Sequence, residues 1–281
     1  MEIERLDEAD ALVADQDQAG NQGVATPETR DQQAYHAEYR ATVEASYSWD
    51  AAALELREAW TAHKEKWPSP EDPGPGDRHL APEANEEVER ACGRIRDIAE
   101  NIITPAMRAI ESEAPDRHLI GLEKCLKGIE RIKEKVADAM QHKGRSPEEA
   151  LATLKDAVRF TLCYGEQRYA SCVTQDCQRL LDRGFQPFDR VNSWEADEYK
   201  GINSRWRDPD SGLLFEVQFH TRASFEAKQL THRAYERLRN PATSDIERGE
   251  LQEFQRKVSA EIPIPPRVTD IEDYSPEQRD G

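Results

Sequence analysis

Long apolar runs are absent from this chain of 281 residues, whose mean hydropathy is −0.88. No segment is therefore suited to a membrane-spanning helix. The N-terminal residues, MEIERLDEADALVADQ, also lack the basic and apolar regions of a Sec signal. Only 7% of the residues are aromatic and 33% are charged, so we expect part of the chain to be extended or disordered. We therefore expect a cytoplasmic protein that does not associate with membranes. Export of the protein by a route other than Sec is left open.

Cysteine is scarce and its spacing is irregular. The chain contains Cys92, Cys125, Cys163, Cys172 and Cys177. The number is odd, and no CxxC motif or His/Cys pair has the spacing of a zinc site. These features argue against a disulfide framework and against structural zinc, so we expect reduced thiols.

Basic residues are outnumbered, and the formal net charge is −18. The imbalance is uneven: residues 116–240 contain 22 Lys and Arg against 20 Asp and Glu, while the rest of the chain has a net charge of −20. Acidic flanks around a nearly neutral, locally basic module do not suit general nucleic-acid binding. They suit a module whose cations bind a small anionic ligand.

Composition divides the chain into four parts. Residues 1–67 form an acidic N-terminal extension, partly disordered and partly helical, whose aromatic residues either bind a partner or pack on the remainder. Residues 68–82 contain five prolines and two glycines and are expected to form a linker. Residues 83–241 form the main module, and residues 242–281 form a helix and an acidic, irregular tail.

Within the module, apolar spacing alternates between the helical and the strand period. It predicts helices over 83–113, from 127, over 168–183 and over 222–239, and strands over 155–164, 185–194 and 213–221. Pro105 is expected to kink or end the first helix, Ser146 and Thr221 to cap later ones, and the turn at 208–212 to close a hairpin. The order indicates an α/β (α+β) fold with a mixed sheet flanked by helices.

The strand at 213–221 carries an unusual polar face. Alternation places Glu216, Gln218 and His220 on one side and apolar residues on the other. A solvated strand also has a polar face, but an acid, an amide and an imidazole in a row suit proton transfer and phosphate binding. The next helix places Ser224, Lys228, His232 and Tyr235 near one face.

These residues resemble the RelA/SpoT-type nucleotide pyrophosphokinases. The segment 216–221, EVQFHT, is similar to the Glu-Ile-Gln-Ile-Arg-Thr strand of that family, and the segment 199–204, YKGINS, is similar to its acceptor-nucleotide loop. His232 and Tyr235 match the His-x-x-Tyr that follows in many members. The resemblance covers about residues 83–241 and implies a nucleotidyltransferase-like fold. It also implies an activity, the transfer of the β,γ-pyrophosphate of ATP to the 3′-hydroxyl of an acceptor nucleotide with Mg²⁺.

The resemblance assigns roles to individual residues. It implies that Glu216 and Asp156 are catalytic residues and Mg²⁺ ligands, with Glu216 as the general base. The residues expected to bind the two nucleotides are Lys127, Arg131, Lys135, Arg159, Tyr199, Lys200, Gly201, Asn203, Gln218 and His220. The first three are spaced i, i+4, i+8 and would form one cationic helix face. Such a face either binds the triphosphate or is solvated and paired with glutamates of the same helix.

Two positions depart from the family pattern. The family's triphosphate-binding Arg falls on Cys125, so donor binding is weak unless Lys124 replaces that Arg. In guanosine-specific relatives a Tyr follows the loop glycine, whereas Ile202 stands here. The Gly-Ile-Asn loop together with Phe-His-Thr resembles the adenosine-directed members, several of which are toxins.

We therefore expect an adenine nucleotide as acceptor, giving (p)ppApp, with a toxin or effector role and an immunity or regulatory protein as partner left open. GDP or GTP as acceptor, giving (p)ppGpp, is the first alternative. The second is a weakened module that binds nucleotide without turnover. Pyrophosphorylation of tRNA ends would require a basic surface, which the acidic N-terminal part does not offer.

Overall fold

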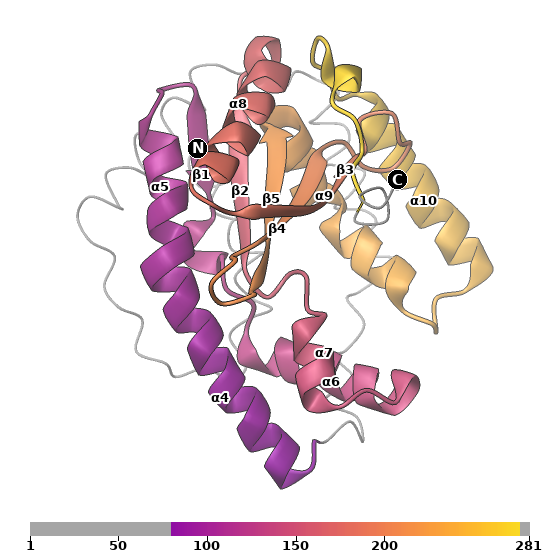
Figure 1. The fold of residues 1–281 in the computed structure, drawn as a ribbon. Coiled ribbons are helices and arrows are strands. Elements are labelled where there is room, and N and C mark those ends of the chain that lie inside the picture. The colour runs from indigo at the N-terminus through magenta and orange to yellow at the C-terminus, as the bar shows by residue number, and fades with distance from the viewer. Residues whose placement is uncertain (1–79, 276–281) are drawn as a thin grey trace, which may run out of the picture. The chain divides into compact units, whose positions relative to one another are not determined.

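The computed structural model describes residues 80–275, which all fall within one compact unit, Ser48–Gly281. The N-terminal extension 1–67 and the linker up to residue 79 lie outside the described residues, so the helices expected there stay predictions. Figure 1 labels the elements that follow. They are α4 (Pro82–Ile98), α5 (Thr104–Ser112), β1 (Arg117–Ile120), α6 (Ile129–Lys143), α7 (Pro147–Ala152), β2 (Arg159–Tyr164), α8 (Tyr169–Asp182), β3 (Gln186–Asn192), β4 (Ile202–Arg207), β5 (Leu214–Thr221), α9 (Arg222–Arg239) and α10 (Asp245–Ala260).

Five strands form one mixed sheet in the order β1-β2-β5-β4-β3, at the centre of the view in Figure 1. β2 and β5 are parallel, and the other neighbouring pairs are antiparallel. This confirms the expected mixed sheet flanked by helices. The hairpin is also confirmed, because Trp206 of β4 pairs with Phe215 of β5 across the turn at 208–212. Within residues 80–275, no helix is both long enough and apolar enough to cross a membrane.

The pairing register separates the strand residues onto two faces. Ile202 lies opposite Phe219, so both belong to the apolar face. Helix α8 covers this face, where the Tyr169 hydroxyl donates to the Phe219 carbonyl at 2.7 Å. Helix α9 crosses the opposite, polar face, and its Lys228 donates to Gln218. The polar residues of β5 are therefore enclosed between sheet and helix.

Local signals of helix ends agree with the structure. Ser146 and Thr221 both cap helices, each in a capping box. Ahead of Pro105, α4 continues through a π-helical turn at Ala99–Ile103 into α5, and the residues at both junctions have right-handed helical backbone angles. Pro105 therefore does not end the helix. Its missing N–H for the carbonyl four residues back coincides with the local change to π-helical hydrogen bonding.

Two expectations about strands were wrong in detail. Strand β1 was missed, because its four residues at the sheet edge are too few to show a clear alternation. The strand expected from residue 155 begins only at Arg159. Among the apolar residues, Leu181 and Val191 are 43% and 41% exposed. The outer turns of α8 and the edge strand β3 leave these side chains at the surface.

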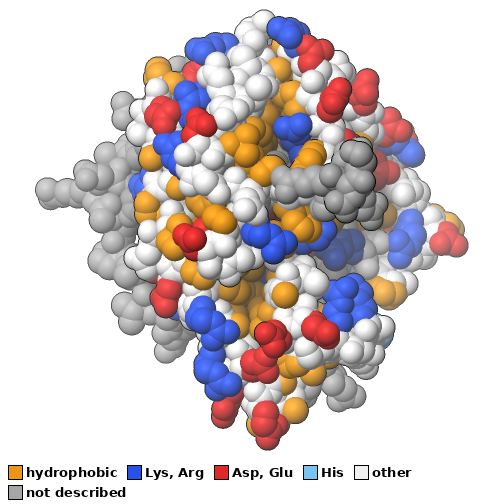
Figure 2. Space-filling model, viewed as in Figure 1, with side chains coloured by type: hydrophobic (Ala, Val, Ile, Leu, Met, Phe, Trp, Pro, Cys, Tyr) orange, Lys and Arg blue, Asp and Glu red, His pale blue; other side chains and the backbone are white. Residues whose placement is uncertain are grey.

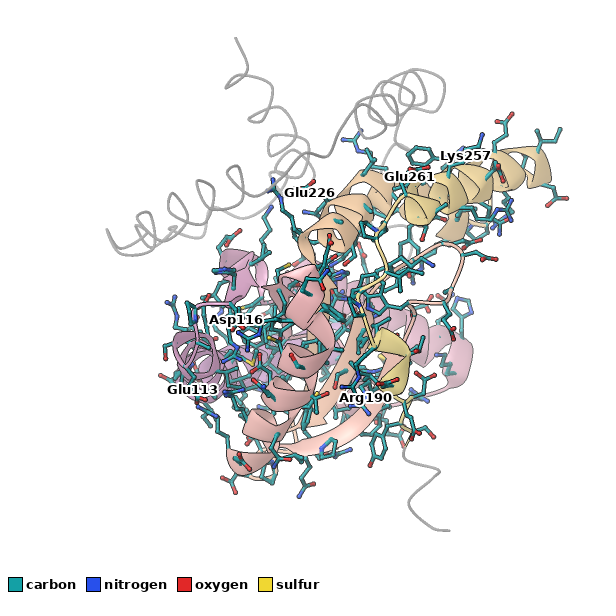
Figure 3. All side chains as sticks on the ribbon, turned by 90° about the horizontal axis from the view of Figure 1, so that it is seen from above. Glu113, Asp116, Arg190, Glu226, Lys257 and Glu261 are labelled. Carbon is teal, nitrogen blue, oxygen red and sulfur yellow. The ribbon has the colours of Figure 1, made fainter. Side chains whose placement is uncertain are left out.

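The C-terminal segment covers the edge strand β3. Arg190 and Tyr274 exchange two backbone hydrogen bonds, at 2.8 and 3.0 Å. The Asn192 side-chain amide also donates to the carbonyls of Val268 and Ile271, both at 2.9 Å. Figure 3 shows Arg190 beside this segment. Between residues 262 and 275 the tail, expected to be irregular, contains one short 3-10 helix at Val268–Asp270, and it satisfies an edge that would otherwise be unpaired.

Candidate active site

Strand β5, which carries the proposed base, lies in the interior of the sheet, and all eight of its residues are buried. The parallel register with β2 places Arg159 opposite Glu216. The Nε atom of Arg159 is 2.9 Å from Oε1 of Glu216. The pairing of the two strands thus brings Glu216 to the place where β2 begins.

Asp156 lies three residues before the start of β2 and forms ion pairs with several cationic side chains. Nζ of Lys127 is 2.9 Å from its Oδ2, and Nζ of Lys135 is 2.8 Å from both of its oxygens. Burial alone would raise the pKa of Asp156, but the hydrogen bonds and charges of Lys135 and Lys127 outweigh burial and lower the pKa to about 2. Asp156 is therefore a carboxylate at any physiological pH.

The loop that carries Lys127 is held against the start of β2 by its backbone. The N–H of Lys127 donates to the Ala157 carbonyl at 2.9 Å, and the N–H of Arg159 donates to the Cys125 carbonyl at 2.7 Å. These two bonds fix Lys127 beside Asp156. They explain why the two residues meet although 28 positions of the chain separate them.

The prediction that Lys127, Arg131 and Lys135 form one cationic helix face was wrong. Lys127 lies before the Gly128 cap of α6, and only Arg131 and Lys135 belong to that helix. Arg131 is 63% exposed and pairs with Glu134 at 3.5 Å. Lys127 and Lys135 instead converge on Asp156 from a loop and from a helix. Figure 2 shows Lys and Arg side chains across the middle of the viewed face, just above the region of α6 and α7.

Gln218 links the proposed base to a lysine of α9. Its Nε2 donates to Glu216 Oε1 at 2.7 Å, and its Oε1 accepts from Nζ of Lys228 at 2.5 Å. An ammonium only donates and an ionised carboxylate only accepts, so the two neighbours together fix the orientation of the amide. Burial lowers the pKa of Lys228 to about 8, and the charge of Arg159 acts in the same direction. The sequence pattern predicted that Lys228 lies on the polar face of this helix, but it did not predict the contact with Gln218.

The loop at 199–204, which was expected to hold the acceptor nucleotide, is anchored on His220. This side chain is fully buried, with Nδ1 2.8 Å from the Ser224 hydroxyl and Nε2 3.0 Å from the Tyr199 hydroxyl. The Tyr199 hydroxyl donates to Oδ1 of Asn203 at 3.0 Å. Gly201 is required beside them, because a Cβ at this position would come within 2.8 Å of the His220 ring. His220, expected to be a phosphate donor, instead supports the loop, since both of its nitrogens are already engaged.

This buried imidazole makes stability depend on pH. Burial, with the Lys228 charge, lowers the pKa of His220 well below its ordinary value, so the unfolded chain binds a proton that the folded chain rejects. The stability that the folded state has with a neutral His220 is therefore complete above about pH 6.5. It is lost as the pH falls, by up to about 1.4 kcal/mol of unfolding free energy per pH unit. We expect His220→Gln to lose less stability than the wild type between pH 7.5 and 5.5 in urea unfolding. Equal losses in the two proteins would contradict this role.

Two further positions of the acceptor loop differ from expectation. Nζ of Lys200 donates to the Ala196 carbonyl at 2.6 Å, and Lys200, Tyr199 and Lys228 line a small pocket closed by the end of α10. Ile202 is fully buried on the face of the sheet that α8 covers, whereas Gln218 lies on the other face. Position 202 therefore presents no side chain to the polar face.

Cys125, which the sequence resemblance aligned with the family's Arg, has a partly buried thiol. The charges of Glu123 and Glu100 act on its pKa in the same direction as burial. Burial raises its pKa. The cations gathered at Asp156 therefore come from other positions.

Asp156 and Glu216 are the two carboxylates that could supply oxygen ligands to Mg²⁺. The guanidinium of Arg159 lies between them, with Nη2 3.4 Å from Oδ2 of Asp156 and Nε 2.9 Å from Oε1 of Glu216. Among residues 80–275, no group of three or more His, Cys, Asp or Glu side chains is arranged to hold a metal ion. A site with two carboxylates is usual for Mg²⁺, which completes its coordination with water and substrate phosphates.

No protein-family model and no curated protein matches this sequence. Among solved structures, the chain is similar to the small alarmone synthetase 1 from Bacillus subtilis, with 18% identity over 62% of this chain and 92% of that one and a TM-score of 0.44. It is also similar to a GTP pyrophosphokinase family protein from Streptococcus pneumoniae (18%; 64% and 90%; TM-score 0.40). A third similar structure is the Bacillus subtilis synthetase 1 bound to its product pppGpp (15%; 64% and 88%; TM-score 0.37).

Proposed function

We propose that this chain transfers the β,γ-pyrophosphate of ATP to the 3′-hydroxyl of an acceptor nucleotide. The observation that carries the proposal is the direct contact of Lys127, Lys135 and Arg159 with Asp156, beside the buried Glu216. Three cations against two carboxylates leave a net positive charge. Such a cluster suits a triphosphate, whose negative charges must be neutralised before an oxygen nucleophile approaches.

Each residue has a defined task in this reaction. The cations, with the exposed Arg131 of α6, bind and orient the triphosphate. Glu216 accepts the proton of the 3′-hydroxyl, whose oxygen forms a bond to the β-phosphorus while the bond to the oxygen of the departing AMP breaks. Gln218 holds Glu216 in place. Mg²⁺, when held by Asp156 and Glu216, neutralises phosphate charge.

We further propose an adenine nucleotide as the preferred acceptor. The support is the likeness of Gly201, Ile202 and Asn203, together with the Phe-His-Thr segment that ends β5, to the adenosine-directed members of the family that the sequence resembles. GDP or GTP as acceptor is the alternative within the same reaction, and binding without turnover is the alternative outside it.

A mass-spectrometric assay tests both levels of the proposal. The full chain is incubated with Mg²⁺, ATP and one of AMP, ADP, GDP or GTP, and the products are identified by mass. We expect AMP release from the donor together with a 3′-pyrophosphorylated adenine nucleotide, and no such product with Asp156→Asn. Products from GDP or GTP alone would overturn the adenine preference, whereas no product from any acceptor would overturn the activity.

A further inference from the structure

Arg159 occupies the position between the two carboxylates to which Mg²⁺ was assigned. Its guanidinium contacts Asp156 and Glu216 at 3.4 and 2.9 Å, and its side chain remains 39% exposed. The register of β2 with β5 places Arg159 there, because it lies directly opposite Glu216. A metal ion and this guanidinium cannot use the same carboxylate oxygens at once.

The contacts of Arg159 are weak for a charged pair. The Nε atom, although 2.9 Å from Glu216 Oε1, makes no hydrogen bond of acceptable geometry. The hydrogen bond to Asp156 is long at 3.4 Å, and Asp156 is already bonded to Lys127 and Lys135. Charge rather than aligned hydrogen bonding therefore holds the guanidinium, which leaves it free to exchange partners.

We propose that Arg159 is an exchangeable counterion of the metal site. In the free protein it neutralises Asp156 and Glu216 and opposes Mg²⁺. When a nucleotide binds, its phosphates offer the guanidinium a bidentate partner, and the carboxylates become available to the metal. Mg²⁺ and nucleotide then bind with positive coupling, and by linkage each raises the affinity of the other by the same factor.

The net charge of the site favours Mg²⁺ binding only when a triphosphate is also bound. Without nucleotide, a divalent ion would join three cations that already outnumber the two carboxylates. With a triphosphate present, the added negative charge exceeds that of the ion. This inference rests on the proposed function for the identity of the nucleotide and the metal, but not for the contacts of Arg159.

Calorimetric titration of the full chain with Mg²⁺, without nucleotide, tests the proposal. We expect Arg159→Ala to bind Mg²⁺ at least about tenfold more tightly than the wild type, because one positive charge in contact with both carboxylates is removed. Arg90→Ala is the matched control, since it removes the same charge from an exposed residue of α4 that pairs with Glu86 at 3.5 Å; its Mg²⁺ affinity should stay within about twofold of the wild type. With α,β-methylene-ATP present, the wild type should gain affinity and Arg159→Ala should gain much less.

Equal or weaker Mg²⁺ binding by Arg159→Ala would overturn the proposal, as would an equal gain in Arg90→Ala. Adding Glu216→Gln to Arg159→Ala should remove the gained affinity, and its persistence would place the metal elsewhere. If Arg159→Ala does not fold, Arg159→Gln serves in its place. Because binding is measured without turnover, a protein that transfers no pyrophosphate but shows this pattern would refute the proposed function and support the counterion.

Discussion

Glu216→Gln should lower the rate of pyrophosphate transfer by about 10²–10⁴-fold while the protein stays folded. The substitution keeps the size and one hydrogen-bond acceptor of the side chain, but it removes the proton acceptor and the charge paired with Arg159. The amide would also meet the Gln218 donor that now bonds to Glu216. Only the chemistry should be affected strongly, since the strand is held by its neighbours on both sides.

Single-turnover measurements with saturating ATP and acceptor test this prediction, with circular dichroism to verify the fold. Glu226→Gln is the matched control: it makes the same change on α9, where the partly buried Glu226 pairs with Arg222. A Glu216→Gln rate within tenfold of the wild type would show that Glu216 is not the base. A loss of the same size in both variants would point to a general effect of charge.

Arg117→Met should lower the free energy of unfolding by about 3–5 kcal/mol. Arg117 and Asp176 are fully or almost fully buried, and Nε of Arg117 is 3.1 Å from Oδ2 of Asp176. The Tyr164 hydroxyl donates to the same oxygen at 2.8 Å, and Arg179 reaches the other oxygen at 3.0 Å. Without Arg117, a buried carboxylate loses its most enclosed cation. Methionine fills much of the space but supplies no charge.

Urea unfolding followed by circular dichroism measures the effect. Arg168→Met is the control at the same corner of the fold, where Arg168 pairs with Asp116 at 2.6 Å while being 61% exposed. Figure 3 labels Asp116 close to Glu113 beside α8. Because the Arg168 guanidinium is mostly exposed to solvent and Asp116 keeps Arg117 at 3.8 Å, the loss of this pair should cost less than about 1 kcal/mol. An Arg117→Met protein within about 1 kcal/mol of the wild type would contradict the assigned role of the buried pair.

Interactions between residues close in sequence were determined by the sequence alone. The turn at 208–212 and the alternation after it predicted the β4–β5 hairpin, and Ser146 and Thr221 predicted two helix starts. Each of these features depends on hydrogen bonds within about four residues, so its signal lies within one short segment. The proposed roles of Glu216 and Asp156 also came from the sequence, through a family resemblance, and they stay predictions.

Contacts between distant segments were decided by the tertiary structure. Periodicity shows which residues of a strand share a face, but not which strand pairs with it or what covers it. The parallel pairing of β2 with β5 placed Arg159 against Glu216, and the loop before α6 brought Lys127 to Asp156. The packing of α9 enclosed His220 and set Lys228 on Gln218. These contacts join residues that are far apart in the sequence and meet only in the folded protein. Local sequence patterns therefore carry no signal of them.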